Sequence, residues 1–338
     1  MGSIVFEKEV LADSLSETVG YKAGLALSIE QICDHLSGTR YPDLILMSEQ
    51  GICRMRSEEY EDLFFKLLHR VGYTKEEYNG DSTGIWMYHK YRDSKDFSAY
   101  EGVTEIFIKM WPELVQAAVA MGVKKIDPEP FMRQAVRQFG KIGLQLAVER
   151  IQVLNNAVNL SPHSGVRFIE WAGVQELTSL FAGSKNAPDY GAFFDQRFID
   201  YLSVNPDMVN QMHWRKFEEM TAEYFHREGF TVELGPGGND DGVDVRIWRP
   251  GAGGTAPHGI VQCKRQKDKI EKVIVKSLMA DLTFEKADIG LIVTSSELSP
   301  GAKKTITARG YPIQEVNKEG IVAWLSKLRS PGTGIVRG

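Results

Sequence analysis

The sequence predicts an α/β protein in which a C-terminal domain, with a mixed central sheet flanked by helices, follows a mostly helical N-terminal domain. Two short stretches, residues 243–248 and 259–265, alternate apolar and polar residues with the period of two that is typical of strands. A third stretch, residues 289–294, is almost continuously apolar, as in a strand that is buried on both faces. The earlier part of the chain instead repeats apolar residues at helical spacing.

Residues 1–190 are expected to form the N-terminal domain, because 338 residues suffice for two hydrophobic cores. Its first segment, up to about residue 37, has helical spacing, and a second helix is expected to start near the capping residue Ser57 and to end at Gly72. We interpret the apolar run at residues 44–47 as a strand or a buried turn. Further helices are predicted at residues 105–121, 130–158 and 168–181, and the polar segment 183–191 is the predicted linker.

Residues 191–338 are expected to form the C-terminal domain. A helix at residues 193–202 leads into it, and an amphipathic helix at 214–228 precedes a strand at 230–234. A loop rich in Gly and Pro then joins the two alternating strands into a hairpin. After the hairpin we expect a helix near 274–282, the strand at 289–294, a helix at 299–308, a strand at 311–316 and a helix at 320–328. This order gives a mixed sheet with helices on its faces.

Three polar side chains of the hairpin point to hydrolytic chemistry. The alternation allows Asp244, Gln262 and Lys264 to converge on one face of the hairpin. A carboxylate binds a hard cation such as Mg²⁺ through oxygen, and the cation lowers the pKa of a bound water. A lysine adds a point charge near a scissile phosphate. The alternative is an ordinary hairpin with three exposed polar residues.

The segments that flank this hairpin resemble the Mrr-type restriction endonuclease domain, a branch of the PD-(D/E)xK nuclease superfamily. The pieces lie in the order of that family and cover roughly the last third of the chain. The resemblance implies a restriction-endonuclease-like fold and hydrolysis of DNA phosphodiester bonds with a divalent metal. The matching pieces are Asn205-Pro206-Asp207-Met208-Val209, Trp214-Arg215-Lys216-Phe217-Glu218, residues 225–232, Asp241-Gly242-Val243-Asp244, Val261-Gln262-Cys263-Lys264-Arg265, residues 292–296 and Ser299-Pro300-Gly301-Ala302.

The resemblance also assigns roles to individual residues. It implies that Asp244 is the catalytic metal ligand and that Lys264 is the motif lysine. Gln262 stands where many members of the superfamily have a second acid, and its amide oxygen can still face a metal or a water. Glu218 matches a helix glutamate that supports the metal site, often through water. The backbone carbonyl of Cys263 is a further candidate ligand. The implied cofactor is Mg²⁺, with Mn²⁺ able to substitute.

The net charge of −5 does not by itself indicate a nucleic-acid-binding protein. From Pro206 onward there are 19 Lys and Arg against 17 Asp and Glu, a net charge of +2, and the rest of the chain has 21 against 28, a net charge of −7. The basic run at residues 264–269, which leaves the second strand of the hairpin, is better placed to bind DNA than the domain as a whole. Beside a phosphate-cleaving site, we expect it to contact the DNA backbone rather than only solvent. The expected DNA-binding residues are Arg265, Lys267 and Lys269, together with Arg246 on the first strand of the hairpin.

Two features of the N-terminal domain allow a functional and a purely structural interpretation. Aromatic and basic residues are interleaved between Trp86 and Tyr100, a pattern that can stack bases and hold phosphates, although rings that fill a core between helices explain it better. The long helix at residues 130–158 is either a scaffold or a dimer interface. One nuclease site cuts one strand, so a symmetric homo-oligomer, a dimer or larger, is the simplest way to break a duplex.

Other sequence features exclude whole classes of protein. Three scattered cysteines form neither a disulfide framework nor a zinc motif, which indicates a reducing, cytoplasmic setting. The chain has no apolar run long enough for a membrane span and no signal-peptide pattern, so no membrane partner is expected.

We therefore predict a Mg²⁺-dependent endodeoxyribonuclease whose partner is DNA, acting in bacterial restriction or anti-phage defence, with modified DNA as one form of substrate. The N-terminal domain would serve recognition, sensing or oligomerisation. A nuclease-type toxin or effector, controlled by a partner protein of a defence system, a signal or its oligomeric state, is an alternative. A DNA-binding regulator with an inactive nuclease fold is a second alternative, which the intact pair of Asp244 and Lys264 disfavours.

Overall fold

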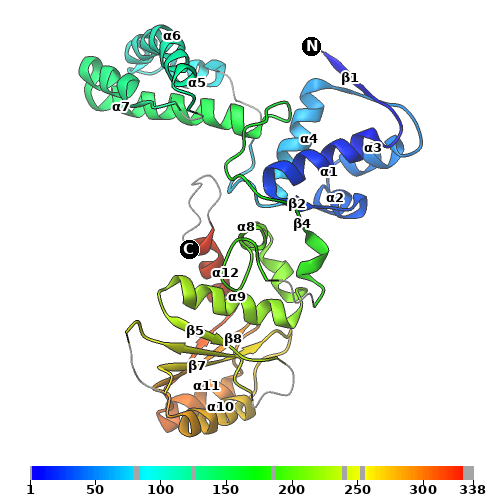
Figure 1. The fold of residues 1–338 in the computed structure, drawn as a ribbon, viewed down its shortest axis with the longest axis vertical. Helices are drawn as coiled ribbons and strands as arrows, with labels where there is room; N and C mark the ends of the chain where they lie inside the picture. Colours follow the sequence, from blue (N-terminus) through cyan, green and yellow to red (C-terminus); the bar gives the residue numbers. More distant parts are fainter. Residues whose placement is uncertain are drawn as a thin grey trace. The chain divides into compact units, whose positions relative to one another are not determined.

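The computed structural model describes residues 2–78, 84–123, 126–183, 187–237, 242–251 and 256–329 (Figure 1). The chain forms two compact units: unit 1 contains Met1–Glu77 and Phe168–Gly338, and unit 2 contains Tyr78–Arg167. These compact units do not coincide with the two domains expected from the sequence, which divide at residue 190. That domain boundary stays a prediction. Residues 184–186 of the expected linker lie outside the described residues.

A mixed sheet forms the C-terminal part of unit 1, which confirms the predicted α/β class (Figure 1). The strands lie in sequence order, with antiparallel pairing from β5 to β7 and parallel pairing from β7 to β9. In the hairpin, Val245 lies opposite Val261. The strands are β5 (Thr231–Leu234), β6 (Val245–Trp248), β7 (Gly259–Lys264), β8 (Ile289–Thr294) and β9 (Ile313–Val316).

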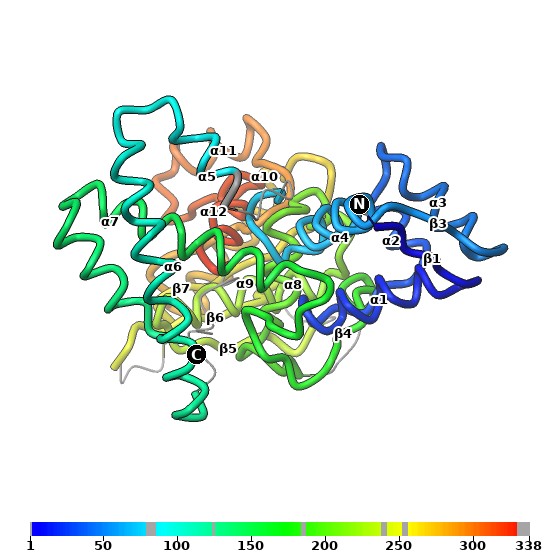
Figure 2. The backbone as a smooth tube through the Cα atoms, turned by 90° about the horizontal axis from the view of Figure 1, so that it is seen from above, coloured from blue at the N-terminus to red at the C-terminus, as the bar shows by residue number. Residues whose placement is uncertain are grey.

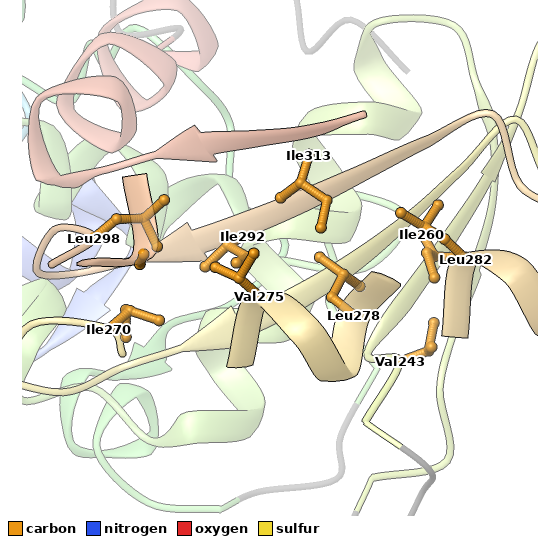
Figure 3. Packing of buried hydrophobic residues seen from close by; sticks show 10 residues of the cluster. Val243, Ile260, Ile270, Val275, Leu278, Leu282, Ile292, Leu298 and Ile313 are labelled. Atoms are coloured by element: carbon orange, nitrogen blue, oxygen red, sulfur yellow. The ribbon is translucent and has the colours of Figure 1, made fainter. Parts of the chain in front are cut away.

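Helices cover both faces of this sheet. Helix α9 (Trp214–Arg227) packs on one face against β5, β6 and β7, and α10 (Lys272–Glu285) and α11 (Pro300–Arg309) lie on the other face (Figure 1). A cluster of buried aliphatic side chains fills the space between the sheet and α10, as Figure 3 shows. Helix α12 (Lys318–Leu328) packs against α8 (Gln196–Val204), α9 and β9. The aliphatic cluster between the sheet and α10 includes Val243, Ile260, Leu278, Leu282 and Ile292.

The N-terminal part of unit 1 packs on the C-terminal part through α8. The guanidinium of Arg329 donates to the carbonyl oxygen of Gly72 at 2.7 Å, and the Asn205 amide donates to the Arg70 carbonyl oxygen at 2.7 Å. Residues 1–77 therefore belong to the same packed unit as the sheet. Their elements are β1 (Ser3–Phe6), α1 (Val10–Ala23), β2 (Leu25–Ala26), α2 (Ile29–His35), α3 (Tyr41–Ser48), β3 (Cys53–Arg56) and α4 (Ser57–Arg70).

Unit 2 is helical, with α5 (Gly84–Tyr91), α6 (Phe97–Ala120) and α7 (Glu129–Leu160). Helices α6 and α7 lie side by side (Figure 2). The backbone of α7 breaks at Gly140, whose φ of 57° and ψ of −136° are not helical. Tyr91 and Tyr100 are buried in the core of this unit, with Trp86 and Phe97 packed against them. These contacts favour the core interpretation of the aromatic segment over base stacking.

Several predictions for the N-terminal part are wrong in detail. Residues 44–47 lie in helix α3, not in a strand or buried turn, because Pro42 in the first turn of this helix favours its start. Residues 168–181 form no α-helix. Trp171 instead anchors an irregular chain by donating from its ring nitrogen to the Lys22 carbonyl oxygen, and a short strand β4 (Gln175–Glu176) and a 3-10 turn (Leu177–Leu180) follow. The first segment divides into α1 and α2, and the paired strands β1 and β3 were not anticipated.

Among the described residues, no helix combines the length and the apolar character that a membrane span requires.

Replacing Gly72 tests the packing of residues 1–77 on α8. Gly72 has a φ of +90°, and a Cβ at this position would lie 2.4 Å from the backbone carbonyl of Asp200. We expect Gly72→Ala to lower the free energy of unfolding by roughly 3 kcal/mol or more, because backbone strain and overlap with a neighbouring backbone add together.

Gly229→Ala is the matched control, since Gly229 also has a φ of +90° but a Cβ added there would meet no other group within 4 Å. We expect only the strain of about 1–2 kcal/mol at this position. Denaturant unfolding of both variants measures the difference, and equal losses would contradict the packing described.

Candidate active site

The carboxylate of Asp244 lies where β6 and β7 meet, just before the first residue of β6. Its backbone N–H donates to the carbonyl oxygen of Val261 at 2.9 Å, and its Oδ2 accepts from the backbone N–H of Cys263 at 2.6 Å. Asp244 is 8% exposed. The hairpin backbone thus holds this carboxylate in a defined position, with a charge-assisted hydrogen bond to one of its oxygens.

Helix α9 brings a second carboxylate to Asp244. His213 caps α9, since its side chain accepts a hydrogen bond from the Arg215 backbone N–H. The apolar face of α9, which includes Phe217 and Met220, is buried. Glu218, 6% exposed, lies on the same helix. Burial, then the negative charge of Asp244, raises the pKa of Glu218 to about 7, although the Arg215 guanidinium, 2.9 Å away, opposes the shift. Two carboxylates in contact favour a shared proton or a cation.

The side chains of β7 alternate between the two faces of the sheet. The Cys263 thiol faces α9, where its sulfur lies 3.6 Å from the Thr221 hydroxyl. Gln262 therefore faces α10, and it is 4% exposed. Its Oε1 is buried and has no hydrogen-bond partner among the described residues. A buried amide oxygen without a donor requires a cation or a water for compensation.

Lys264 is half-buried at the end of β7. Burial and the charges of Asp244 and Glu218 raise the pKa of the Cys263 thiol, whereas the Lys264 ammonium lowers it. Asp244, Glu218 and Lys264 therefore lie within electrostatic reach of one buried thiol. Glu218 comes from the α9 side, where it contacts Asp244, and Gln262 points to the α10 side. Their catalytic roles stay predictions.

Comparison with known proteins identifies the family of this segment. Residues 209–325 match the Mrr_cat family, which is described as a restriction endonuclease family. The segment is a Mrr_cat restriction endonuclease domain.

Two individual proteins also show similarity. An uncharacterised protein, y4cE of Sinorhizobium fredii, is 29% identical over 107 residues, which are 31% of this chain and 27% of the relative. A solved structure, described as the MspJI restriction endonuclease in complex with a 27-mer oligonucleotide, is 18% identical. The structural match covers 58% of this chain and 42% of the MspJI chain. Its TM-score of 0.29 is too low to indicate a shared overall arrangement.

The basic residues expected to bind DNA have different surroundings in the restriction endonuclease domain. The Arg265 guanidinium donates to the Asn210 carbonyl oxygen at 2.7 Å, and Lys269 pairs with Glu297 at 2.8 Å. Arg246 pairs with Glu285 at 2.6 Å. Lys267 is exposed. Three of the four thus already have protein partners, so a phosphate would have to share or displace those contacts.

Arg215 is a charged residue at the site that sequence reasoning did not single out. It lies three residues before Glu218 on α9, so the two side chains share a helix face. This spacing is visible in the sequence and could have indicated the pair. Its guanidinium balances part of the charge of the two buried carboxylates.

The residues present fit a hard divalent cation. Among the described residues there is no group of three or more His, Cys, Asp and Glu that could hold a metal ion. Mg²⁺, however, is usually bound through one or two carboxylates together with waters and substrate phosphate. Asp244 and Glu218 supply two carboxylates in contact, and Gln262 Oε1 supplies a buried oxygen that still needs a partner.

The raised pKa of Glu218 predicts a pH dependence of stability in the metal-free protein. The folded state holds the Glu218 proton more tightly than the unfolded state, so this group stabilises the fold below its unfolded pKa. That contribution is lost as pH rises through about 7. Denaturant unfolding in EDTA should therefore show Glu218→Gln gaining stability relative to wild type between pH 5 and pH 8, by up to about 3 kcal/mol.

Glu319→Gln, on the exposed face of α12, serves as the control and should follow wild type at every pH. A constant difference between Glu218→Gln and wild type across this range would refute the buried contact of the two carboxylates.

Proposed function

We propose that the restriction endonuclease domain is a divalent-metal-dependent endonuclease that hydrolyses DNA phosphodiester bonds, with Mg²⁺ as its metal and Mn²⁺ as a substitute. The observation that carries the proposal is the buried contact of Asp244 with Glu218, with the Lys264 ammonium within electrostatic reach of the same Cys263 thiol. Gln262 adds a buried Oε1 that has no hydrogen-bond partner among the described residues. Negative charge concentrated in a buried place is costly unless a cation neutralises it. The family match to a restriction endonuclease supports the same reaction.

The side chains divide the work of this reaction. Asp244, held by the Cys263 N–H, would be the direct metal ligand, and Glu218 and Gln262 would complete the protein oxygens around it. A bound divalent cation supplies a water of lowered pKa and neutralises phosphate charge. Lys264 would hold its positive charge beside the scissile phosphate and stabilise the charge that develops there. The Cys263 carbonyl remains a candidate further ligand.

The proposal extends to the setting of the whole chain. Restriction or anti-phage defence in the bacterial cytoplasm, with modified DNA as one class of substrate, follows from the family resemblance rather than from the site. One site cuts one strand, so we also propose that the full chain is at least dimeric. Light scattering together with a plasmid assay for nicks and double-strand breaks measures both properties, and a monomer that breaks both strands in one encounter would exclude the dimer.

Lys264→Ala should leave the fold intact and abolish cleavage, because the side chain is half-buried at a strand end and not part of the core. We expect a loss of roughly 10²-fold or more in the cleavage rate with Mg²⁺, in line with the removal of one group that stabilises developing charge. Binding of DNA should persist. The measurement is plasmid cleavage on methylated and unmethylated DNA, with thermal unfolding as the test of folding.

Lys304→Ala, which removes an exposed lysine from α11, is the matched control and should cleave as wild type does. A folded Lys264→Ala protein with the wild-type cleavage rate would remove this residue from the mechanism.

Asp244→Asn tests the metal ligand with little change in shape. The amide oxygen can still accept from the Cys263 N–H, so the hairpin should fold, but a charged hard-oxygen ligand is lost. We expect a raised metal requirement or no cleavage, and a weaker calorimetric signal for Mn²⁺ binding. Wild-type cleavage should stop in EDTA, and cleavage that EDTA leaves unchanged would point to a different mechanism.

A further inference from the structure

Helix α10 contributes a carboxylate that comes close to the candidate metal site from behind the sheet. Asp281 lies on α10 between Leu278 and Leu282, which pack in the same buried cluster as Ile260 of β7 (Figure 3). Gln262 lies two residues after Ile260 on the same strand, so it faces the same helix. The packing of α10 on β7 therefore brings Asp281 toward the Gln262 amide.

Gly242 lies close to both side chains. A Cβ on this residue would lie 3.1 Å from Nε2 of Gln262 and 3.8 Å from Oδ2 of Asp281. Both side chains thus lie near Gly242, two residues before Asp244. Gly242 has a φ of +88°, so a glycine suits this position on backbone grounds as well.

The two ends of the Gln262 amide differ chemically, so a nearby carboxylate favours one orientation of the amide over the other. A glutamine amide has a donor end, Nε2, and an acceptor end, Oε1, whereas an ionised carboxylate only accepts. A carboxylate on the Nε2 side favours the amide orientation that the structure shows and disfavours the reverse, which would bring two oxygens together. The Oε1 end is then left on the other side, where no described residue donates to it.

We propose that Asp281 is a positioning residue that orients the Gln262 amide so that Oε1 is presented to the divalent cation. The proposal rests on the metal-dependent nuclease function proposed above. It explains how a neutral glutamine can replace a carboxylate as a ligand, since only one end of an amide can bind a cation. Groups that orient metal ligands from behind typically change metal affinity by 10- to 100-fold.

Calorimetric titration of Mn²⁺ into the full-length protein without DNA tests the proposal, because it requires no cleavage. Asp281→Ala should weaken Mn²⁺ binding about tenfold or more. Asp281→Asn keeps an acceptor oxygen at this position and should lose much less. Asp288→Ala, which removes an exposed carboxylate beyond the end of α10, is the control and should bind as wild type does.

Repeating the titrations in a Gln262→Glu background separates orientation from simple loss of negative charge. Both oxygens of a glutamate can bind a cation, so no orienting group is needed, and Asp281→Ala should then weaken Mn²⁺ binding only slightly. A pure charge effect would persist at the same size in this background. Equal fold losses in the two backgrounds, or no loss in wild type, would overturn the role of Asp281.

The outcomes also distinguish this proposal from the one on which it rests. If wild type binds no Mn²⁺, or if Asp244→Asn leaves Mn²⁺ binding unchanged, both proposals fail. If Asp244→Asn abolishes binding and Asp281→Ala does not affect it, only the positioning role fails. Thermal unfolding of each variant verifies the fold, and Asp281→Asn provides the result if Asp281→Ala does not fold.

Discussion

The hydrogen bond from the Cys263 N–H to the Asp244 carboxylate is the contact on which the site depends. This bond joins Asp244, the residue before β6, to the backbone of β7. The position of the carboxylate is therefore fixed by the strand backbone as well as by its own side-chain torsions. The sheet in turn is held between α9 and α10. Helix α9 brings Glu218 into contact with Asp244 from one face, and α10 brings Asp281 toward Gly242 and Gln262 from the other.

This arrangement is electrostatically costly without a cation. Burial and mutual repulsion raise the pKa of Glu218, and the Arg215 guanidinium, which lies in direct contact with it, offsets part of this shift. A buried acidic pair of this kind is more often a functional device than a source of stability. A divalent cation would convert the same repulsion into favourable interactions, which is the physical reason to prefer a metal-dependent nuclease over an inactive copy of the fold.

Much of the C-terminal part could be predicted from the sequence, because its elements carry strong periodic signals. The alternation around Val245 and Val261 and the apolar run of β8 define strands without tertiary information, and the amphipathic pattern of α9 defines a helix that places Glu218. The N-terminal part was harder to predict. Pro42 can end or begin a helix, and the apolar residues around Trp171 anchor an irregular chain through contacts that no local pattern encodes.

The candidate site, too, could be predicted only in part from the sequence. Asp244, Gln262 and Lys264 were grouped by strand alternation, but the approach of Asp281 depends on how α10 packs across β7, which is a tertiary property. The most direct test of the account is anomalous diffraction from crystals of the full-length protein grown with Mn²⁺. We predict a manganese peak at ligand distance from the Asp244 carboxylate and from Gln262 Oε1. A bound manganese elsewhere, with neither Asp244 nor Gln262 among its ligands, would contradict it.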